Sequence, residues 1–152
     1  MRTDLDHWLV LLHVLGAMVW LGAWAAICMF AANAVDRPAA DPLRRLFAVM
    51  RSIGPALIGP STLVVLGSGI WLVIRSERAG FADVWIVAGL ALYALATLVG
   101  MIWLSRASRA ATTALDREDV AAATAATRTW LRWAVVVSGT LVLATADMVL
   151  RP

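Results

Sequence analysis

Four long stretches of the chain are almost entirely apolar, and short polar segments separate them. The apolar stretches are residues 8–34, 55–74, 84–104 and 130–150. Each is close to the ~20 residues that a helix needs to cross the hydrocarbon of a bilayer. Strands are not expected, because an open sheet would leave unpaired backbone groups in lipid. The pattern therefore predicts an all-α fold, an up-down bundle of four transmembrane helices in a single integral membrane domain, residues 1–152.

The first polar connection has a helical pattern of its own. Its apolar residues recur at helical spacing with arginines between them; they are Leu43, Leu46, Phe47 and Met50. This pattern is typical of a short amphipathic helix that lies on the membrane interface. In the following apolar stretch, Pro60 lies one turn after Pro55. Because proline removes a backbone donor and clashes with the preceding turn, we expect a kink near Pro60.

The third polar connection, residues 105–128, is rich in Ala and Thr. Within it, Asp116 is followed three residues later by Asp119, an arrangement in which a carboxylate caps the start of a helix. We therefore expect the third and fourth helices to extend past the membrane as a helical hairpin that turns near Asp116.

The charged residues are few, and they lie mainly between the apolar stretches. The chain is 62% hydrophobic and 15% charged, with a net charge of +3. A soluble domain of this size could not bury so much apolar side chain. The basic residues orient the protein in its membrane and do not form a nucleic-acid-binding face, so we expect a lipid bilayer as the partner and no nucleic acid.

The arginines are distributed unequally between the two sides of the predicted membrane. Nine belong to the first and third connections, and four belong to the opposite side. The nine are Arg37, Arg44, Arg45, Arg51, Arg106, Arg109, Arg117, Arg128 and Arg132, and the four are Arg2, Arg75, Arg78 and Arg151. The richer side is expected to be cytoplasmic, which places both termini outside.

His13 is the most informative polar residue, because it lies inside the first apolar stretch. Gly16, Ala17, Trp20 and Trp24 follow it at helical spacing, so His13 shares a face with small residues and two large rings. A polar group at this depth needs a partner and is a candidate functional residue. Three roles are open: a hydrogen bond to a neighbouring helix, ligation of haem or a metal, and proton handling.

Asp147 is the second candidate, in the last apolar stretch. It lies four residues before Arg151, at the spacing of a helical ion pair. Alternatively, the predicted topology brings it to the depth of His13, where its carboxylate would hold one ring nitrogen and leave the other for a ligand. A copper site combining His13 with Met148 is a weaker possibility. His7 lies on a different helical face from His13.

Several short motifs together resemble a bacterial family of four-span integral membrane proteins of unknown function. The motifs are Leu12-His13-Val14-Leu15-Gly16, Val19-Trp20-Leu21-Gly22, Gly69-Ile70-Trp71-Leu72, Asp83-Val84-Trp85 and Met148-Val149-Leu150-Arg151-Pro152. The resemblance covers nearly the whole chain. It implies a multi-pass protein of the bacterial inner (cytoplasmic) membrane.

The first-span motif is also similar, more remotely, to the copper-resistance D family and to the membrane protoporphyrinogen oxidases. Those likenesses imply a first-span histidine that meets haem or copper, and His13 is the matching position. The oxidases also rely on an intramembrane lysine, and all 13 basic residues here are Arg. The oxidase activity is therefore not carried over with the fold.

The sequence favours a small integral membrane protein of undetermined activity that acts as a structural or assembly module. Its partner would be a second copy or another membrane protein. The alternative is a b-type haem-binding or metal-binding redox protein, in which His13 is the ligand and Trp20, Trp24 and Asp147 complete the site. Haem b is favoured over copper, and whether the protein is an enzyme is left open.

Overall fold

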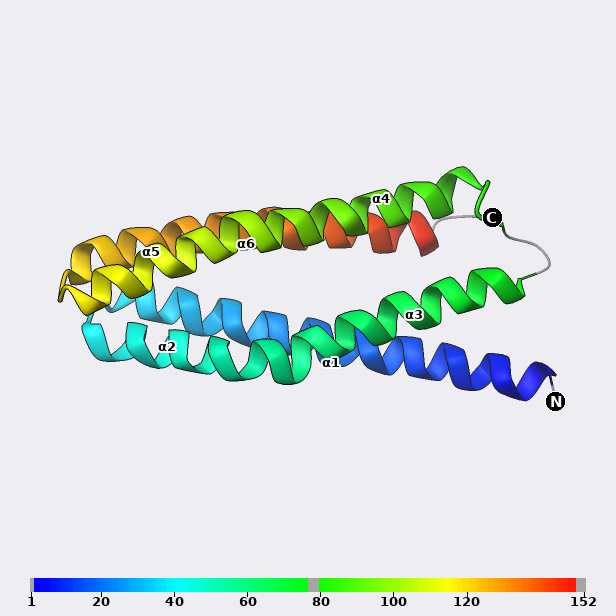
Figure 1. Ribbon diagram of the computed structural model, residues 1–152, viewed down its shortest axis with the longest axis horizontal. Coiled ribbons are helices and arrows are strands. Elements are labelled where there is room, and N and C mark those ends of the chain that lie inside the picture. Colours follow the sequence, from blue (N-terminus) through cyan, green and yellow to red (C-terminus); the bar gives the residue numbers. More distant parts are fainter. Residues whose placement is uncertain (1, 77–79, 150–152) are drawn as a thin grey trace. The chain divides into compact units, whose positions relative to one another are not determined.

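The computed structural model describes residues 2–76 and 80–149, with side chains for residues 4–76 and 80–146. These residues form helices and short turns, without a strand. The α-helices are α1 (Arg2–Asp36), α2 (Ala40–Ile53), α3 (Gly59–Arg75), α4 (Val84–Val99), α5 (Ser105–Asp116) and α6 (Val120–Val149), as drawn in Figure 1. Two π-helical turns join them: η1 (Gly54–Ile58) between α2 and α3, and η2 (Gly100–Leu104) between α4 and α5. The all-α prediction is confirmed for this part of the chain.

Four helical stretches are long and apolar enough to cross a membrane. They are Asp4–Asp36, Ala40–Arg75, Val84–Asp116 and Val120–Ala146. Each contains one predicted span or most of it, but the helices extend well beyond the apolar residues. The largest difference concerns the second stretch, where the chain remains helical from Ala40 to Arg75. The short helix expected in the first connection is therefore continuous with the second span, because η1 links α2 to α3 without a break.

The helices divide into two compact units. One unit contains Met1–Ile27 with Val49–Phe81, and therefore the first part of α1 together with η1 and α3. The other contains Cys28–Ala48 with Ala82–Pro152, and therefore the end of α1, most of α2, and α4 to α6. In the second unit, α6 packs against α4, η2 and α5. We call the first unit the α1–α3 unit and the second the α4–α6 unit, although most of α2 belongs to the second.

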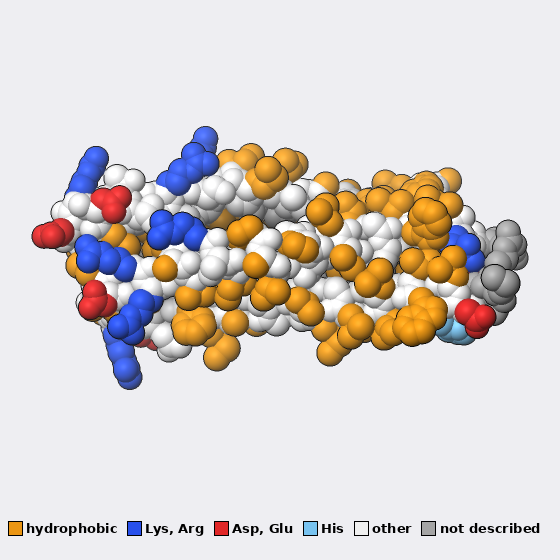
Figure 2. All heavy atoms as spheres, turned by 60° about the horizontal axis from the view of Figure 1, so that its bottom comes forward, with side chains coloured by type: hydrophobic (Ala, Val, Ile, Leu, Met, Phe, Trp, Pro, Cys, Tyr) orange, Lys and Arg blue, Asp and Glu red, His pale blue; other side chains and the backbone are white. Residues whose placement is uncertain are grey.

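Large apolar side chains cover the outside of the spans. Leu63 on α3 is 71% exposed, Val84 on α4 is 74% exposed and Val135 on α6 is 71% exposed. Figure 2 shows such side chains along the helices, with arginine side chains toward the helix ends. In water this exposure would be strongly unfavourable, whereas in lipid it carries no cost. The surface is thus that of a membrane-embedded protein.

The two π-helical turns interrupt the α-helical hydrogen bonding at glycines. In η1 the Gly59 amide donates to the Gly54 carbonyl, five residues back, and Pro55 removes a nearby donor. The structure thus has a π-turn that ends two residues before Pro60, and the kink expected near this proline stays a prediction. The second turn, η2, begins at Gly100 without any proline and was not predicted from the sequence.

The hairpin between α5 and α6 turns where the sequence predicts. The Asp119 amide donates to the Ala114 carbonyl and the Glu118 amide donates to the Leu115 carbonyl, the pair of bonds that ends many helices as a Schellman motif. Glu118 has φ 60°, the left-handed conformation that this motif requires. Asp119 then caps α6, because its Oδ1 accepts the Ala122 amide at 2.9 Å. The capping prediction is confirmed for Asp119.

Three apolar side chains of helix α2 are covered by protein. Leu43, Leu46 and Phe47 are all buried, with Leu43 0% exposed. On its polar side, Arg44 donates to the Leu115 carbonyl at 3.3 Å, so it adds a cation to the end of α5. The burial shows that these apolar residues contribute to the core of the α4–α6 unit.

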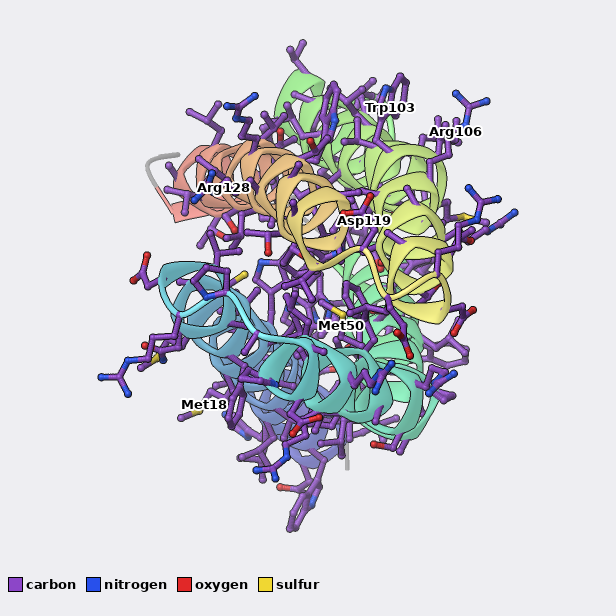
Figure 3. All side chains as sticks on the ribbon, turned by 90° about the vertical axis from the view of Figure 1, so that its left-hand side faces the viewer. Met18, Met50, Trp103, Arg106, Asp119 and Arg128 are labelled. Carbon is purple, nitrogen blue, oxygen red and sulfur yellow. The ribbon has the colours of Figure 1, made fainter. Side chains whose placement is uncertain are left out.

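The hairpin resembles a water-soluble helical protein in its distribution of side chains. Between Leu104 and Ala134, all of which is described, no large hydrophobic side chain is exposed. Its buried positions are mostly small, and include Ala107, Ala111, Ala123 and Thr127. Asp119 marks the turn of the hairpin in Figure 3. The spans thus change near Leu104 from an apolar surface to a polar one.

Candidate functional site

The face of α1 that carries His13 is the partly buried face of this helix. His13, Gly16, Ala17, Trp20 and Trp24 all have intermediate exposure, whereas residues on the opposite face, such as Met18, are exposed. This agrees with the helical spacing of the sequence, which predicts that these five residues share one face. His7 is exposed and does not belong to the face.

Helices α1 and α3 approach closely at two glycines. A Cβ atom added to Gly16 would lie 3.0 Å from Cγ1 of Val64 and 3.2 Å from Cγ2 of Val65. A Cβ atom added to Gly69 would lie 3.2 Å from Cε1 of His13. Glycine therefore leaves room for a neighbouring side chain at both positions, as is common where membrane helices pack without a hydrophobic driving force.

His13 is hydrogen-bonded to Ser68 of α3. The distance from His13 Nδ1 to Ser68 Oγ is 3.0 Å, and Ser68 is only 5% exposed. The Ser68 hydroxyl lies 2.5 Å from the Val64 carbonyl and 3.3 Å from the Val65 carbonyl. A hydroxyl has one proton, and the short contact to Val64 takes it. Ser68 must therefore accept from His13, which places a proton on Nδ1.

This hydrogen bond selects one tautomer of the neutral imidazole. With the proton on Nδ1, the other ring nitrogen, Nε2, has an unshared electron pair and can accept a proton or bind a metal. Nε2 has no hydrogen-bond partner among the described residues. The proton position is inferred from the hydrogen-bond pattern, because hydrogens are not observed directly. The arrangement leaves Nε2 of His13 available to a ligand.

A second polar contact joins the same helices two turns away. The Arg75 Nε–H group donates to Oδ1 of Asp6. From Asp6 to His13 the chain advances by 7 residues, and from Arg75 to Ser68 it goes back by 7. The two helices are thus antiparallel, with contacts repeating every seven residues. Both polar contacts lie between the same two helix faces.

The same register brings Trp20 to the level of Ser61, a further 7 residues along each helix. Trp20 is half-buried and Ser61 is 7% exposed. Ser61 makes no hydrogen bond to another described residue. Serine and threonine hydroxyls elsewhere in the helices donate to the carbonyl four residues back. For Ser61 that carbonyl is Leu57, inside the π-turn η1, which displaces it from its α-helical position.

The other candidate residues lie outside this contact. Trp24 is half-buried and makes an interaction of its own. The backbone of Asp147 belongs to α6, but its side chain, like Met148, lies outside the described side chains. Its pairing with His13 therefore stays a prediction, as do its pairing with Arg151 and a copper site with Met148. Within the described residues, no group of three His, Cys, Asp or Glu side chains could hold a metal ion.

Two of the partners found here were not predicted from the sequence. No role was predicted for Ser68 or Asp6, and Arg75 was counted only among the arginines on one side of the membrane. The antiparallel arrangement of spans one and two could have predicted the Asp6–Arg75 contact. In such a hairpin, residues before the first span and after the second lie on the same side of the membrane. That argument pairs Asp6 with Arg75 as oppositely charged groups, but it does not fix the helix rotation that brings Ser68 to His13.

The helices are long enough to span a membrane, their outer surfaces are apolar, and α1 and α3 are joined by a hydrogen bond between polar side chains. These features define a class of protein: a small all-helical integral membrane protein. The chain belongs to the family described as "Predicted integral membrane protein (DUF2269)", which matches residues 7–152. This confirms the resemblance to a membrane protein family of unknown function. No curated protein and no solved structure matches the chain. The remote likeness to the copper-resistance D and oxidase families stays a prediction.

Proposed function

We propose that the protein is a structural or assembly module of the bacterial inner membrane, in which the four spans form an up-down bundle with both termini outside. The nine arginines of the first and third connections support this orientation. The polar surface of the α5–α6 hairpin suits the cytoplasm, because it has no exposed large hydrophobic side chain. Helix α2 lies at the same interface in this arrangement, with Arg45 and Arg51 exposed.

The observation that carries the assembly function is the position of Gly67. This glycine is on the exposed face of α3, between the exposed side chains of Leu63 and Trp71, and a Cβ added to it would meet nothing within 4 Å. Glycine costs roughly 1 kcal/mol in a helix interior relative to alanine. Among the described residues, Gly67 has no packing contact that offsets this cost. Because Gly67 has no side chain, it leaves a notch in the surface of α3 between Leu63 and Trp71. A helix of another protein molecule would fill this notch. The partner is a second copy of the chain or another membrane protein.

Replacing Gly67 with leucine tests self-assembly. We expect the wild type to form a defined oligomer in nanodiscs and Gly67→Leu to shift it toward monomer by at least tenfold in dissociation constant, because the side chain fills the notch. Subunit counting by single-molecule photobleaching measures the shift. The matched control is Val142→Leu, since Val142 is 67% exposed on α6 and gains one methylene without closing a notch. A wild type that is monomeric at every density would contradict self-assembly.

A second function is favoured by the proton position on His13. We infer that Nε2 of His13 would bind the iron of haem b, with Trp20 and Trp24 on the same helix face as His13. Haem requires only one or two protein ligands, because the porphyrin supplies four. Copper or zinc alone needs several protein ligands together, and none of the described side chains gather in that way. Hydrogen bonding of Nδ1 to Ser68 would orient the ring and increase the basicity of Nε2.

The absorption spectrum of the purified protein tests this ligand function. We expect a Soret band after reconstitution with haem, loss of this band in His13→Ala and its retention in His7→Ala, because His7 is exposed outside the partly buried face. Ser68→Ala is expected to retain haem with a shifted reduction potential, since it removes the acceptor of Nδ1–H. A spectrum without haem bands after reconstitution, or one unchanged in His13→Ala, would reject His13 as the ligand.

A further inference from the structure

The surface of the α4–α6 unit changes from apolar to charged within about one helical turn, and two tryptophans mark the change. The rings of Trp103 and Trp133 have centroids 5.1 Å apart and are tilted by 35°. Trp103 is 38% exposed, and the apolar residues Met101 and Val135 near this level are about 70% exposed, at 68% and 71%. Amphipathic indole rings favour the headgroup region of a bilayer. The Trp103–Trp133 pair therefore indicates the depth of the lipid headgroups on this unit.

Four arginines lie just beyond this pair on the polar side. Arg106 and Arg109 follow Trp103 on α5, and Arg128 and Arg132 precede Trp133 on α6; all four are exposed. Figure 3 shows Arg106 pointing away from its helix. Arg106 is three residues from Trp103 and Arg132 is adjacent to Trp133, so both begin within about 5 Å of the tryptophans along the helix axis.

The side chains of these arginines are unpaired in the described part of the protein. None of the four guanidinium groups makes an ion pair or a hydrogen bond with another described residue. The acidic residues of the hairpin, Asp116, Glu118 and Asp119, lie at its turn, which is ten or more residues after Arg106. At 1.5 Å per residue the separation is about 15 Å, beyond the Debye length at physiological ionic strength. The cationic charge beside Trp103 and Trp133 is thus not compensated by the acidic residues of the hairpin.

We propose that Trp103, Trp133, Arg106 and Arg132 form a binding site for the headgroup of an anionic phospholipid. A planar guanidinium binds phosphate oxygens through two parallel hydrogen bonds. The indole rings lie against the glycerol region, and the acyl chains continue along the exposed apolar residues Met101 and Val135. The arginines thus face the phosphate, the indole rings face the glycerol, and the apolar residues face the acyl chains. This order along the protein surface is the order of the groups in a phospholipid. A soluble acidic peptide would leave the apolar part of this surface uncovered.

The site predicts selectivity for anionic over zwitterionic lipid. The probes are phosphatidylglycerol and phosphatidylcholine at equal mole fraction, and native mass spectrometry counts the lipids retained. We expect the wild type to retain phosphatidylglycerol preferentially. The double variant Arg106→Gln/Arg132→Gln should reduce that preference roughly ten- to thirty-fold, the size expected for removing two basic residues next to an anionic surface. Arg117→Gln, at the hairpin turn, removes a charge far from the tryptophans and should leave the preference unchanged.

Tryptophan fluorescence locates the bound lipid and does not depend on the arginine variants. Phosphatidylglycerol brominated near the headgroup end of its chains should quench the wild-type emission more than the matching phosphatidylcholine does. The difference should disappear in Trp103→Phe/Trp133→Phe. Equal retention and equal quenching by the two lipids would overturn the site. So would an arginine double variant that behaves like Arg117→Gln.

Discussion

Replacing Gly16 with leucine is expected to lower the free energy of unfolding by about 3 kcal/mol, at the upper end of overpacking effects. The first atom of the new side chain would already lie 3.0 Å from Val64 and 3.2 Å from Val65. The remaining atoms would have to enter the space that α3 occupies. Leucine is a better helix former than glycine, so the α1 backbone itself would be stabilised. The net loss therefore understates the cost at the contact between the two helices, and the gain in helix propensity has to be measured separately.

The matched control for this substitution is Gly22→Leu on the same helix. Gly22 is exposed and has nothing within 4 Å of an added Cβ, so we expect leucine there to be neutral or slightly stabilising. Unfolding in mixed micelles with increasing sodium dodecyl sulfate, followed by circular dichroism, gives both values. Equal values for the two variants would contradict the close approach of α1 and α3. Loss of the His13–Ser68 hydrogen bond should accompany the Gly16→Leu change.

Leu43→Ala is expected to have an effect of similar size in the other unit, about 2–5 kcal/mol. Leu43 is 0% exposed on α2, so the deletion of its isobutyl group leaves a cavity. If instead the apolar face of α2 lay in lipid, the cavity would be filled by acyl chains and the cost would be small. The substitution thus distinguishes a packed α2 from a helix that simply lies on the membrane.

The control for Leu43→Ala is Leu143→Ala, the same chemical change at a side chain that is 62% exposed. We expect this variant to lose less than about 1 kcal/mol, as is usual for exposed positions. Guanidinium-induced unfolding in a mild detergent, with Trp emission as the signal, compares the two. A small and equal loss in both variants would mean that the apolar face of α2 is not buried in the protein.

The parts of the fold that depend on local sequence were predictable. The four apolar stretches identify the spans because lipid requires long apolar helices, and Asp119 identifies the hairpin turn because its carboxylate is placed to cap the following helix. The common face of His13, Trp20 and Trp24 follows from helical geometry alone. The extension of the last two spans into a helical hairpin that turns near Asp116 was predicted as well, whereas the unbroken continuation of α2 into the second span was not.

The partner of His13 was not predictable, since it depends on how two helices are aligned and rotated. A shift of α3 by one residue would turn Ser68 by about 100° and remove it from the contact. The group found at Nδ1 is a serine hydroxyl, and the pairing of a ring nitrogen with Asp147 stays a prediction. The π-turn at Gly100 was missed for a related reason, because it has no proline to indicate it.

The seven-residue repeat of contacts between α1 and α3 constrains how the sequence can change over evolution. An ideal α-helix drifts by about 20° per seven residues from such a repeat, so contacts that keep it require the two helices to wind around each other with left-handed twist. A single-residue insertion between Asp6 and His13 would rotate one polar contact away from the other. Relatives should therefore keep the number of residues between these contacts, and variation in length should be confined to the connections.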